Sequence, residues 1–339
     1  MEGVSIIICC YNSGNRIAET LRYIADQDLA PQMPCEVILV NNASADDTVI
    51  RGIKAWESFS KGEIAFRIIE QPVPGLLHAR KKGIEEASYD ILVFCDDDNH
   101  LQSDYIRIAW KIMNERRDVG IAGGCVDPKL PFYPGRWIEA NYAALAIGTQ
   151  GVEPKYTDWV FGAGMVIRKQ IYERLRRSGI DLMLSGRLRS KQTSGDDAEI
   201  CQLARFIGYK VFYTPALRLG HQIAVHRLKK ADFIKANYKN VFHAVYLYLL
   251  EELIREKGLH EKKAFRKFVR LRFMNIFYFG PRIFFGKNSF FSLMMLLQNL
   301  QLLLWLFKNR RNFRETFYAV RVNLYQGQIA AIAKDVKAV

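Results

Sequence analysis

The feature of this sequence that most constrains its fold is the alternation of two hydrophobic periods along the first 130 residues. Apolar runs of strand length recur there, and most gaps between them carry helical periodicity, as at Ile17, Leu21 and Ile24. The expected strands cover residues 4–10, 36–40, 64–69, 90–95 and 119–123. Strands that are almost continuously apolar and separated by helices are typical of a parallel sheet covered on both faces. The sequence therefore predicts an α/β fold with helices flanking a sheet.

Polar side chains follow three of these expected strands at the point where each strand ends. They are Tyr11 and Asn12, Asn41 and Asn42, and the acidic run Asp96, Asp97 and Asp98. Because ligands of such sheets bind beyond the carboxyl ends of the strands, we expect these residues to surround one site. Adjacent carboxylates repel one another by about 1 kcal/mol or more per pair unless water, hydrogen bonds or a cation intervenes. The alternative is a solvated turn in which Asp98 or Asn99 caps the next helix.

The usual glycine motifs of nucleotide-binding proteins are absent from the sequence. It has no G-x-G-x-x-G after the first expected strand and no G-x-x-x-x-G-K-[ST] at any position. A phosphate cradle at a helix N-terminus is therefore not expected. A divalent cation held by the carboxylates is the natural alternative.

The pattern of the sequence changes after residue 150. Residues 159–175 are expected to form two short strands around a glycine-rich turn, followed by a helix that begins near Lys169. The polar segment 185–197 has neither period and is expected to be a mobile loop over the site. Asp197 is expected to open a helix that Gly208 ends.

Seven segments resemble the ordered motifs of the family 2 glycosyltransferases, which have the GT-A fold. They are VSIIICCYNSGNRI, VILVNNASADDT, GLLHARKKGI, ILVFCDDDN, FGAGMVIRK, SGDDAEI and GHQI, all within about residues 4–227. The resemblance implies a Rossmann-like mixed sheet with flanking helices and an inverting transferase that uses a nucleotide sugar. It also implies a catalytic domain over 1–227, with a nucleotide-binding half at 1–130 and an acceptor and catalytic-base half at 131–227.

The acidic run resembles the D-x-D motif of that family. The resemblance implies that Asp98 ligates Mg²⁺ or Mn²⁺, that Asp96 holds the ribose or assists the metal, and that Asp97 also lies at the nucleotide. Hard oxygen ligands suit these ions, which neutralise charge on the leaving diphosphate. His221 stands at the family's late metal-side histidine, and a neutral imidazole can complete a Mn²⁺ shell. A purely structural histidine is the alternative.

The segment SGDDAEI resembles the acidic pair that precedes a helix in the family. The resemblance implies that Asp197 is the general base and that Asp196 orients the acceptor or the loop. An inverting transfer needs one carboxylate opposite the leaving group to accept the proton of the acceptor hydroxyl. The alternative is that either residue only caps the helix.

The strand-end asparagines match the family's nucleotide-contacting positions. Tyr11 and Asn12 match the turn that packs on the base and ribose, and Asn41 and Asn42 match the pair that contacts the base. The sequence departs from the commonest pattern at Asn41, where an aspartate often pairs with uracil. An amide offers both a donor and an acceptor, so a pyrimidine still fits.

The resemblance also implies residues for the diphosphate and for the sugars. Arg80 matches an arginine that reaches the diphosphate or the acidic run, and its alternative is an exposed member of a basic trio. Trp159, with the turn from Gly162 to Gly164, would line the sugar and acceptor subsites. Aromatic faces pack against sugar rings, and glycines admit close approach of the chain.

The basic excess of the chain lies in its C-terminal third. Residues 1–220 hold 27 Lys and Arg against 28 Asp and Glu, whereas residues 221–339 hold 22 against 7. This asymmetry predicts an anionic surface as the partner of a helical, basic region over 228–339. Within 262–273, four apolar residues share one helix side while basic residues take the other, which is typical of an interfacial membrane helix. These apolar residues are Phe265, Phe268, Val269 and Phe273.

The apolar stretch 289–307 is long enough to span a bilayer. Gln298, Asn299 and Gln301 make such a span costly. A helix buried against the catalytic domain and a helix lying in the membrane plane are the alternatives.

Cysteine usage and the N-terminus both favour a cytoplasmic location. The six cysteines lie mostly in apolar strand-like runs without a C-x-x-C pair, which favours reduced, buried thiols over disulfides or a zinc site. The chain enters VSIIICC without a basic n-region or cleavage site, so no signal peptide is expected. We therefore expect a protein that is peripheral on the inner face of the cytoplasmic membrane.

The expected function is transfer of a sugar from a nucleotide donor, with a UDP-sugar favoured, to a hydroxyl of a glycan or lipid-linked glycan in cell-surface polysaccharide or lipopolysaccharide synthesis. Transfer to a polyprenyl phosphate is the alternative among enzymes. A basic protein that binds nucleic acid or membrane without catalysis is the alternative from another class. Aliphatic residues alternate with the basic ones, and no zinc-finger or RNP-type motif occurs, so no nucleic-acid partner is expected.

Overall fold

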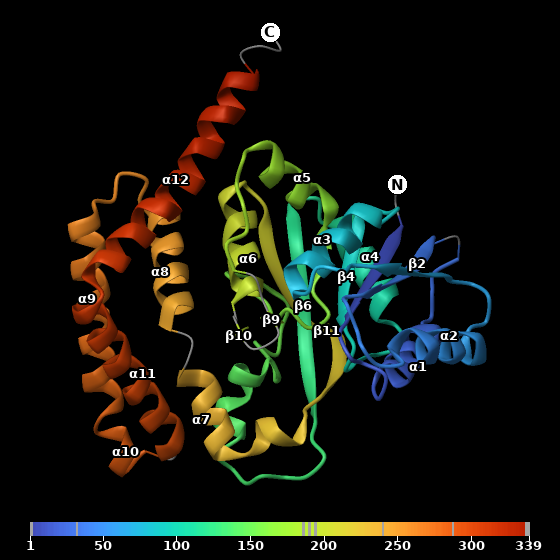
Figure 1. The fold of residues 1–339 in the computed structure, drawn as a ribbon, viewed down its shortest axis with the longest axis horizontal. Helices are drawn as coiled ribbons and strands as arrows, with labels where there is room; N and C mark the ends of the chain where they lie inside the picture. Colours follow the sequence, from blue (N-terminus) through green and yellow to red (C-terminus); the bar gives the residue numbers. More distant parts are fainter. Residues whose placement is uncertain are drawn as a thin grey trace. The chain divides into compact units, whose positions relative to one another are not determined.

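The structure of the chain is a computed structural model whose contacts divide into two compact units (Figure 1). It describes residues 3–31, 33–184, 187–188, 191–192, 195–238, 241–286 and 288–335, and side chains over 3–31, 33–184, 195–236, 243–286 and 288–325. The first unit comprises residues 1–130, 146–174 and 182–223, and the second comprises 131–145, 175–181 and 224–339. The domain boundaries expected at 130 and 227 stay predictions.

The first unit is built on one mixed sheet. Its strands are β1 (Val4–Cys10), β2 (Cys35–Asn41), β3 (Ala65–Glu70), β4 (Ile91–Asp96), β5 (Asn99–Leu101), β6 (Val119–Lys129), β7 (Lys155–Thr157), β8 (Val166–Arg168) and β11 (Lys210–Gln222). The order across the sheet is β3-β2-β1-β4-β8-β6-β11-β5, and β7 pairs with β11. The first four are parallel, while β8 runs antiparallel between β4 and β6. The predicted α/β fold with a mixed sheet is confirmed.

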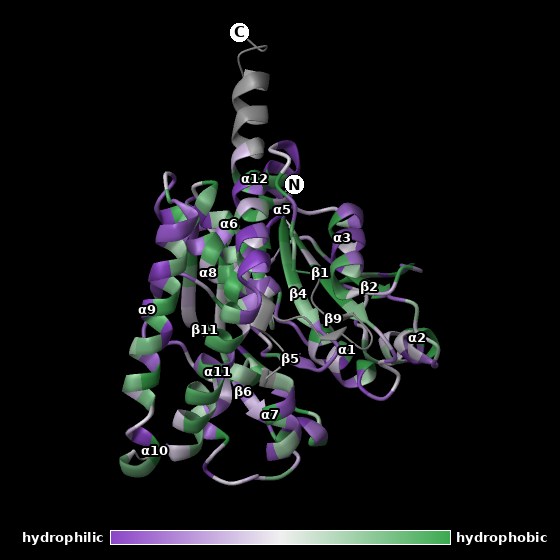
Figure 2. Ribbon diagram, turned by 60° about the vertical axis from the view of Figure 1, so that its left-hand side comes forward, coloured by the Kyte–Doolittle hydropathy of each residue, from purple (hydrophilic) through white to green (hydrophobic). Residues whose placement is uncertain are grey.

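Helices cover both faces of this sheet. They are α1 (Ile17–Ala25), α2 (Thr48–Phe59), α3 (Leu76–Glu86), α4 (Tyr105–Glu115), α5 (Lys169–Arg177), whose end belongs to the second unit, and α6 (Asp196–Phe206). Neighbouring residues of a strand point to opposite faces. Leu39 lies against Gly52 of α2, and Val40 lies against Gly83 of α3, so α2 and α3 cover opposite faces of β2. Strands β1, β2 and β4 are therefore apolar and buried on both faces (Figure 2).

The second unit is helical. Its elements are η1 (Glu139–Leu145), η2 (Val225–Leu228), α7 (Lys230–Tyr238), α8 (Val241–Arg255), α9 (Glu261–Phe279), α10 (Arg282–Phe285), α11 (Ser289–Lys308) and α12 (Arg310–Asp335). Within it, α9 and α10 pack on α11, and α8 packs on α12. Among the described residues, α11 is the one helix long and apolar enough to cross a membrane, and 33% of its most apolar window is buried.

A buried polar residue fixes how α11 packs. Asn299 accepts hydrogen bonds from Arg272 Nη1 and Asn275 Nδ2 of α9, both at 3.2 Å. Its own amide nitrogen donates to the Met295 carbonyl at 2.6 Å. The stretch 289–307 is thus a helix. The face that carries Asn299 packs on α9, and the other face is left exposed.

The lipid-facing side predicted for 262–273 is occupied largely by protein. Phe268 is fully buried and its ring lies 4.9 Å from that of Tyr248 on α8. The ring of Phe265 lies 5.4 Å from that of Phe313 on α12. The apolar side of the first half of α9 therefore packs on α8 and α12. Aromatic rings of the three helices contact one another there.

Two further expectations concern the segments before α6. Only the second of the two strands expected in 159–175 forms, as β8, and residues 158–165 have no strand. In the loop expected at 185–197, residues 185–186, 189–190 and 193–194 lie outside the described residues. Within the described remainder, β9 (Arg187–Leu188) pairs with β10 (Lys191–Gln192).

Candidate functional site

The register of the parallel strands brings the predicted polar residues to one edge of the sheet. β1 pairs with both β2 and β4, and Cys10 lies beside Asn41. On the other side of β4, the short strand β5 places Asn99 beside His221 of β11. The acidic run and His221 are therefore neighbours, although Asp98 and His221 lie 123 positions apart in the sequence.

Hydrogen bonds hold the turn after β1 against the loop after β2. Asn12 has a left-handed backbone with φ of 51°. Its side chain accepts the Ala45 N–H at 2.8 Å, and its own N–H donates to Ser44 Oγ at 3.0 Å. Asp46 accepts the Gly14 N–H at 3.0 Å. Asn12 thus fixes the shape of the two loops, and Tyr11 stands exposed beside it.

The two strand-end asparagines have different partners. Asn42 donates to two backbone carbonyls of the loop after β3, at 3.1 and 2.7 Å, and accepts the Gly75 N–H at 2.7 Å. Its amide therefore fixes the start of α3. Asn41 donates to the carboxylate of Glu70 at 2.8 Å. The base-contacting roles of both asparagines stay predictions.

The side chains of the acidic run Asp96–Asp98 do not all face the same partner. Asp97 forms an ion pair with Arg16 at 2.7 Å and accepts a hydrogen bond from Ser13, so its side chain anchors the start of α1. Burial raises the pKa of Asp97, and Asp98 adds to this effect while Arg16 opposes it. The middle carboxylate is thereby engaged by the protein itself.

Asp98 faces His221 instead. Nε2 of His221 lies 3.6 Å from Asp98 Oδ1, and both side chains are largely buried. Nδ1 of His221 is buried and has no hydrogen-bond partner within the described part of the chain. A carboxylate oxygen and an imidazole nitrogen this close can ligate one divalent ion.

The protein donors at this position suit an ion that is shared with a phosphate ligand. Over the described residues, no group of three or more His, Cys, Asp and Glu side chains could hold a metal. Mg²⁺ is commonly bound by one or two carboxylates together with substrate phosphates. The pair Asp98 and His221 fits that mode, and it does not fit a closed structural metal site.

The second acidic cluster lies at the N-terminus of α6. Asp197 accepts the Gly162 N–H at 3.2 Å and the Ala198 N–H at 2.8 Å. Burial, followed by the charge of Asp196, raises the pKa of Asp197 to about 6. A carboxylate with this pKa can accept a proton near neutral pH.

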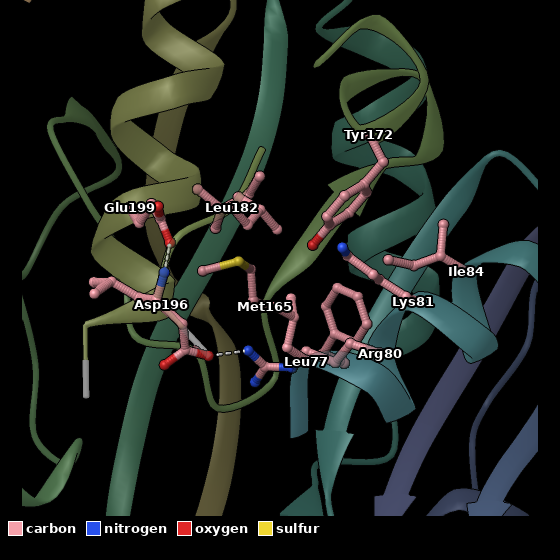
Figure 3. Close-up of a pocket in the computed structure, with 13 residues that line it drawn as sticks. Leu77, Arg80, Lys81, Ile84, Met165, Tyr172, Leu182, Asp196 and Glu199 are labelled. Carbon is pink, nitrogen blue, oxygen red and sulfur yellow. Dashed lines mark hydrogen bonds and ion pairs between the residues drawn. The ribbon is translucent and has the colours of Figure 1, made fainter. Parts of the chain in front are cut away.

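Arg80 connects the two acidic clusters. It projects from α3, forms an ion pair with Asp196 and lies 5.2 Å from the centre of the Phe94 ring (Figure 3). Burial alone would lower the pKa of Arg80, but the charges of Asp196 and Asp96 raise it above its usual value. Arg80 is therefore a fixed positive charge between the clusters, and its reading as an exposed surface residue is wrong.

A small cavity lies beside this ion pair. It is lined by Leu77, Arg80, Lys81, Ile84, Phe94, Gly162, Met165, Tyr172, Leu182, Leu184, Asp196, Glu199 and Ile200 (Figure 3). Its volume of about 20 Å³ is room for about one water molecule. The cavity is therefore too small for a sugar ring.

The residues predicted for the sugar and acceptor subsites have different surroundings. The Trp159 ring is exposed and lies 5.2 Å from that of Phe161. Gly162 lies beside Asp197 through its N–H. Gly164 has φ of 69°, and a side chain there would meet Leu219 and Tyr105 of the core. Gly164 thus has a packing reason to be glycine, and a subsite role for it stays a prediction.

Sequence reasoning missed Glu199, which lies three residues after Asp196. Its buried carboxylate accepts the N–H groups of Met183 at 2.7 Å and Leu184 at 2.9 Å. It therefore ties the chain that enters the 185–197 segment to the helix carrying the acidic pair. The available signal was the position of Glu199 next to the apolar Ile200 in the expected helix. A carboxylate that is buried at such a position requires hydrogen-bond partners.

Comparison with known sequences gives one family. The sequence model described as Glycosyl transferase family 2 matches residues 5–176. The chain is 29% identical over 118 residues to the putative glycosyltransferase EpsH of Bacillus subtilis (strain 168), a match covering 35% of this chain and 32% of that protein. It is 27% identical over 105 residues to the poly-beta-1,6-N-acetyl-D-glucosamine synthase of Staphylococcus epidermidis, covering 31% of this chain and 24% of that protein. The matches thus span about a third or less of these relatives.

A solved structure supports the fold. The chain resembles TarS of S. aureus with a TM-score of 0.52 and 16% identity, over 98% of this chain and 53% of that chain. At this identity the likeness concerns the fold alone. The GT-A type of fold expected from the sequence motifs is confirmed.

Proposed function

The chain belongs to glycosyl transferase family 2, and we propose that it is a metal-dependent, inverting transferase that moves a sugar from a nucleotide donor to a hydroxyl group. The single observation that carries the proposal is the placement of Asp197. It has a raised pKa and lies across Arg80 from the acidic strand end. This arrangement supports a base on one side of the reacting carbon and a leaving-group site on the other.

The donor half of the site is proposed at the strand ends. Tyr11 and the loop clamped by Asn12 would hold the base and ribose of the nucleotide, with a UDP-sugar as the favoured donor. Asp98 and His221, assisted by Asp96, would hold Mg²⁺ or Mn²⁺. When bound, such an ion would neutralise the charge that develops on the leaving diphosphate.

The acceptor half is proposed at the start of α6. As the acceptor hydroxyl oxygen bonds to the anomeric carbon, the bond from that carbon to the diphosphate oxygen breaks, and Asp197 accepts the hydroxyl proton. Backbone N–H groups of Gly162 and Ala198 hold the Asp197 carboxylate in place. Arg80 holds Asp196 by an ion pair, and Asp196 would orient the acceptor or the 185–197 segment. Trp159 would pack on a sugar ring.

The acceptor class is proposed from the composition of the chain. A glycan or lipid-linked glycan of a cell-surface polysaccharide would be presented at an anionic membrane, to which the basic residues of 228–339 are attracted. The protein would then lie on the inner face of the cytoplasmic membrane. The similarity to a poly-beta-1,6-N-acetyl-D-glucosamine synthase supports polysaccharide synthesis as the setting.

The test is release and binding of nucleotide with a panel of sugar nucleotides, each with Mn²⁺, with Mg²⁺ and with EDTA. We expect metal-dependent release from one donor, lost in Asp98→Ala and retained in Glu153→Ala, a control carboxylate on an exposed loop. Absence of metal-dependent binding for every nucleotide would overturn the proposal. If the Asp197→Asn variant still transferred the sugar to a polyprenyl phosphate, no acceptor hydroxyl would need to be deprotonated. That result would support the alternative function.

A further inference from the structure

Large apolar side chains are unusually exposed where α9 ends and α10 begins. Phe277 is 77% exposed, Phe284 is 81% exposed and Phe285 is 91% exposed. With Phe273, Met274 and Tyr278, which are also exposed, they form what we call the aromatic tip. Monomeric proteins rarely expose apolar side chains together in this way, and such patches mark interaction sites.

A contact between side chains links the α9 and α10 parts of the aromatic tip. Phe273, Met274, Phe277 and Tyr278 recur at helical spacing, so they share one face of α9. α10 follows after a short turn, and its rings of Phe284 and Phe285 lie 6.4 Å apart. The guanidinium of Arg282 lies 3.6 Å from the centre of the Tyr278 ring, which joins α10 to α9.

Within the described part of the helical unit, α9 packs through side chains other than those of the aromatic tip. α9 meets α11 through Arg272 and Asn275, which donate to Asn299, and through Phe279, whose ring lies 5.9 Å from that of Phe291. The four residues of the aromatic tip that belong to α9 lie between these positions and are exposed. Figure 2 shows α9 becoming mainly hydrophobic toward α10.

The charge around the aromatic tip selects its partner. Residues 262–314 contain 12 Lys and Arg and no Asp or Glu. Three of these cations, Arg266, Arg270 and Arg282, are exposed on α9 and α10. A second copy of the chain docked on this surface would bring cations against cations, which disfavours a symmetric dimer. An anionic lipid surface satisfies both the charge and the aromatic composition, because aromatic side chains favour the membrane interface and basic ones favour its headgroups.

We propose that the aromatic tip inserts into the boundary between headgroups and acyl chains of an anionic bilayer. Phe284 and Phe285 enter most deeply, and Arg270 and Arg282 contact lipid phosphates. The inference rests on the membrane association proposed above and assigns it to six side chains rather than to the whole basic region. It also gives α11 a structural role, because its buried Asn299 is hydrogen-bonded to α9.

The experiment is flotation of the full chain with vesicles of phosphatidylcholine alone or mixed with phosphatidylglycerol. The test variant is F284S/F285S, and the control is Val152→Ser, which removes an equally exposed apolar side chain (83%) from the first unit. We expect the wild type and the control to float with the anionic vesicles, and the double variant to partition about tenfold less. Arg270→Gln combined with Arg282→Gln should weaken binding about tenfold at low salt and less at high salt.

The outcomes separate the aromatic tip from the wider proposals. Wild-type binding that F284S/F285S leaves unchanged would overturn the role of the aromatic tip while keeping membrane association. Recovery of the wild type in the membrane fraction after alkaline extraction would indicate a span by α11 and would also overturn it. Failure of the wild type to float with any vesicle would contradict membrane association and, with it, the role of the aromatic tip. Nucleotide binding measured on the same samples reports folding and tests the transferase proposal independently.

Discussion

Arg80 on α3 forms an ion pair with Asp196 at the start of α6, across 116 positions of the chain. The same guanidinium lies in the field of Asp96 at the end of β4. One cation therefore stabilises the approach of two carboxylate clusters that would repel one another. The distance between the proposed leaving-group side and the proposed base is set through this residue.

Replacing Arg80 by methionine should leave Asp196 without its ion-pair partner. Both side chains are mostly buried, so we expect the free energy of unfolding to fall by about 3 kcal/mol. The control is Arg51→Met, whose ion pair with Asp47 is exposed and should be worth less than about 1 kcal/mol. Urea unfolding of both variants measures the difference. Equal losses in the two variants would contradict a special role for the Arg80 ion pair.

The activity should depend on pH through Asp197. A base must be ionised to accept a proton, and the pKa of Asp197 is raised to about 6 by burial and by Asp196. We therefore expect kcat/KM to rise as pH increases through about 6 and then to level off. Asp197→Asn should lower kcat by about 10²-fold or more and remove this rise. A profile that stays flat from about pH 5 to about pH 8 for the wild type would contradict the assignment.

Asp196→Asn provides an independent check on the same titration. It removes the neighbouring negative charge that helps to raise the pKa of Asp197 and releases Arg80 from its partner. Both changes favour the ionised form of Asp197, so the rising limb of the profile should move to lower pH. A structural effect alone would lower the rate without moving the limb.

Neighbouring carboxylates of the acidic run should respond differently to substitution. Asp98→Asn and His221→Gln are expected to weaken Mn²⁺-dependent nucleotide binding, because their side chains lie 3.6 Å apart and suit one ion. Asp97→Asn is expected to lower the free energy of unfolding by about 1 to 3 kcal/mol through its contacts to Arg16 and Ser13. Calorimetric titration and thermal unfolding separate the two effects. Loss of metal-dependent binding in Asp97→Asn at unchanged stability would instead support the nucleotide role first predicted for Asp97.

The sequence predicted the sheet and the edge that carries the polar residues, because near-continuous apolar strands have one favourable arrangement. The apolar run before Asp96 became β4, and the helix expected from Asp197 became α6 within one residue. The sequence could not predict which way each carboxylate points. Asp97 turns to Arg16 while Asp98 faces His221, and this choice depends on partners from α1 and β11.

The helical region shows the same limit of sequence reasoning. Helical periodicity identified an apolar side of α9 but not what covers it. Phe265 and Phe268 pack on other helices, whereas the exposed Phe277 and Phe285 lie further along the chain. An amphipathic pattern indicates that a face is buried or bound, and only the packing of α8 and α12 decides between protein and lipid.

Gly164 should tolerate substitution much less than a glycine of the same backbone conformation elsewhere. Gly164 and Gly179 both have φ of 69°, so alanine is strained equally at either position. At Gly164, however, a Cβ atom would lie 2.3 Å from Leu219 Cδ2 and 2.6 Å from the Tyr105 hydroxyl, whereas nothing lies within 4 Å of one at Gly179. We expect Gly179→Ala to lower the free energy of unfolding by about 1 kcal/mol and Gly164→Ala to lower it by about 3 kcal/mol or more. Thermal and urea unfolding measure both, and equal losses would show that backbone strain alone, rather than the close approach of Leu219 and Tyr105, requires glycine at position 164.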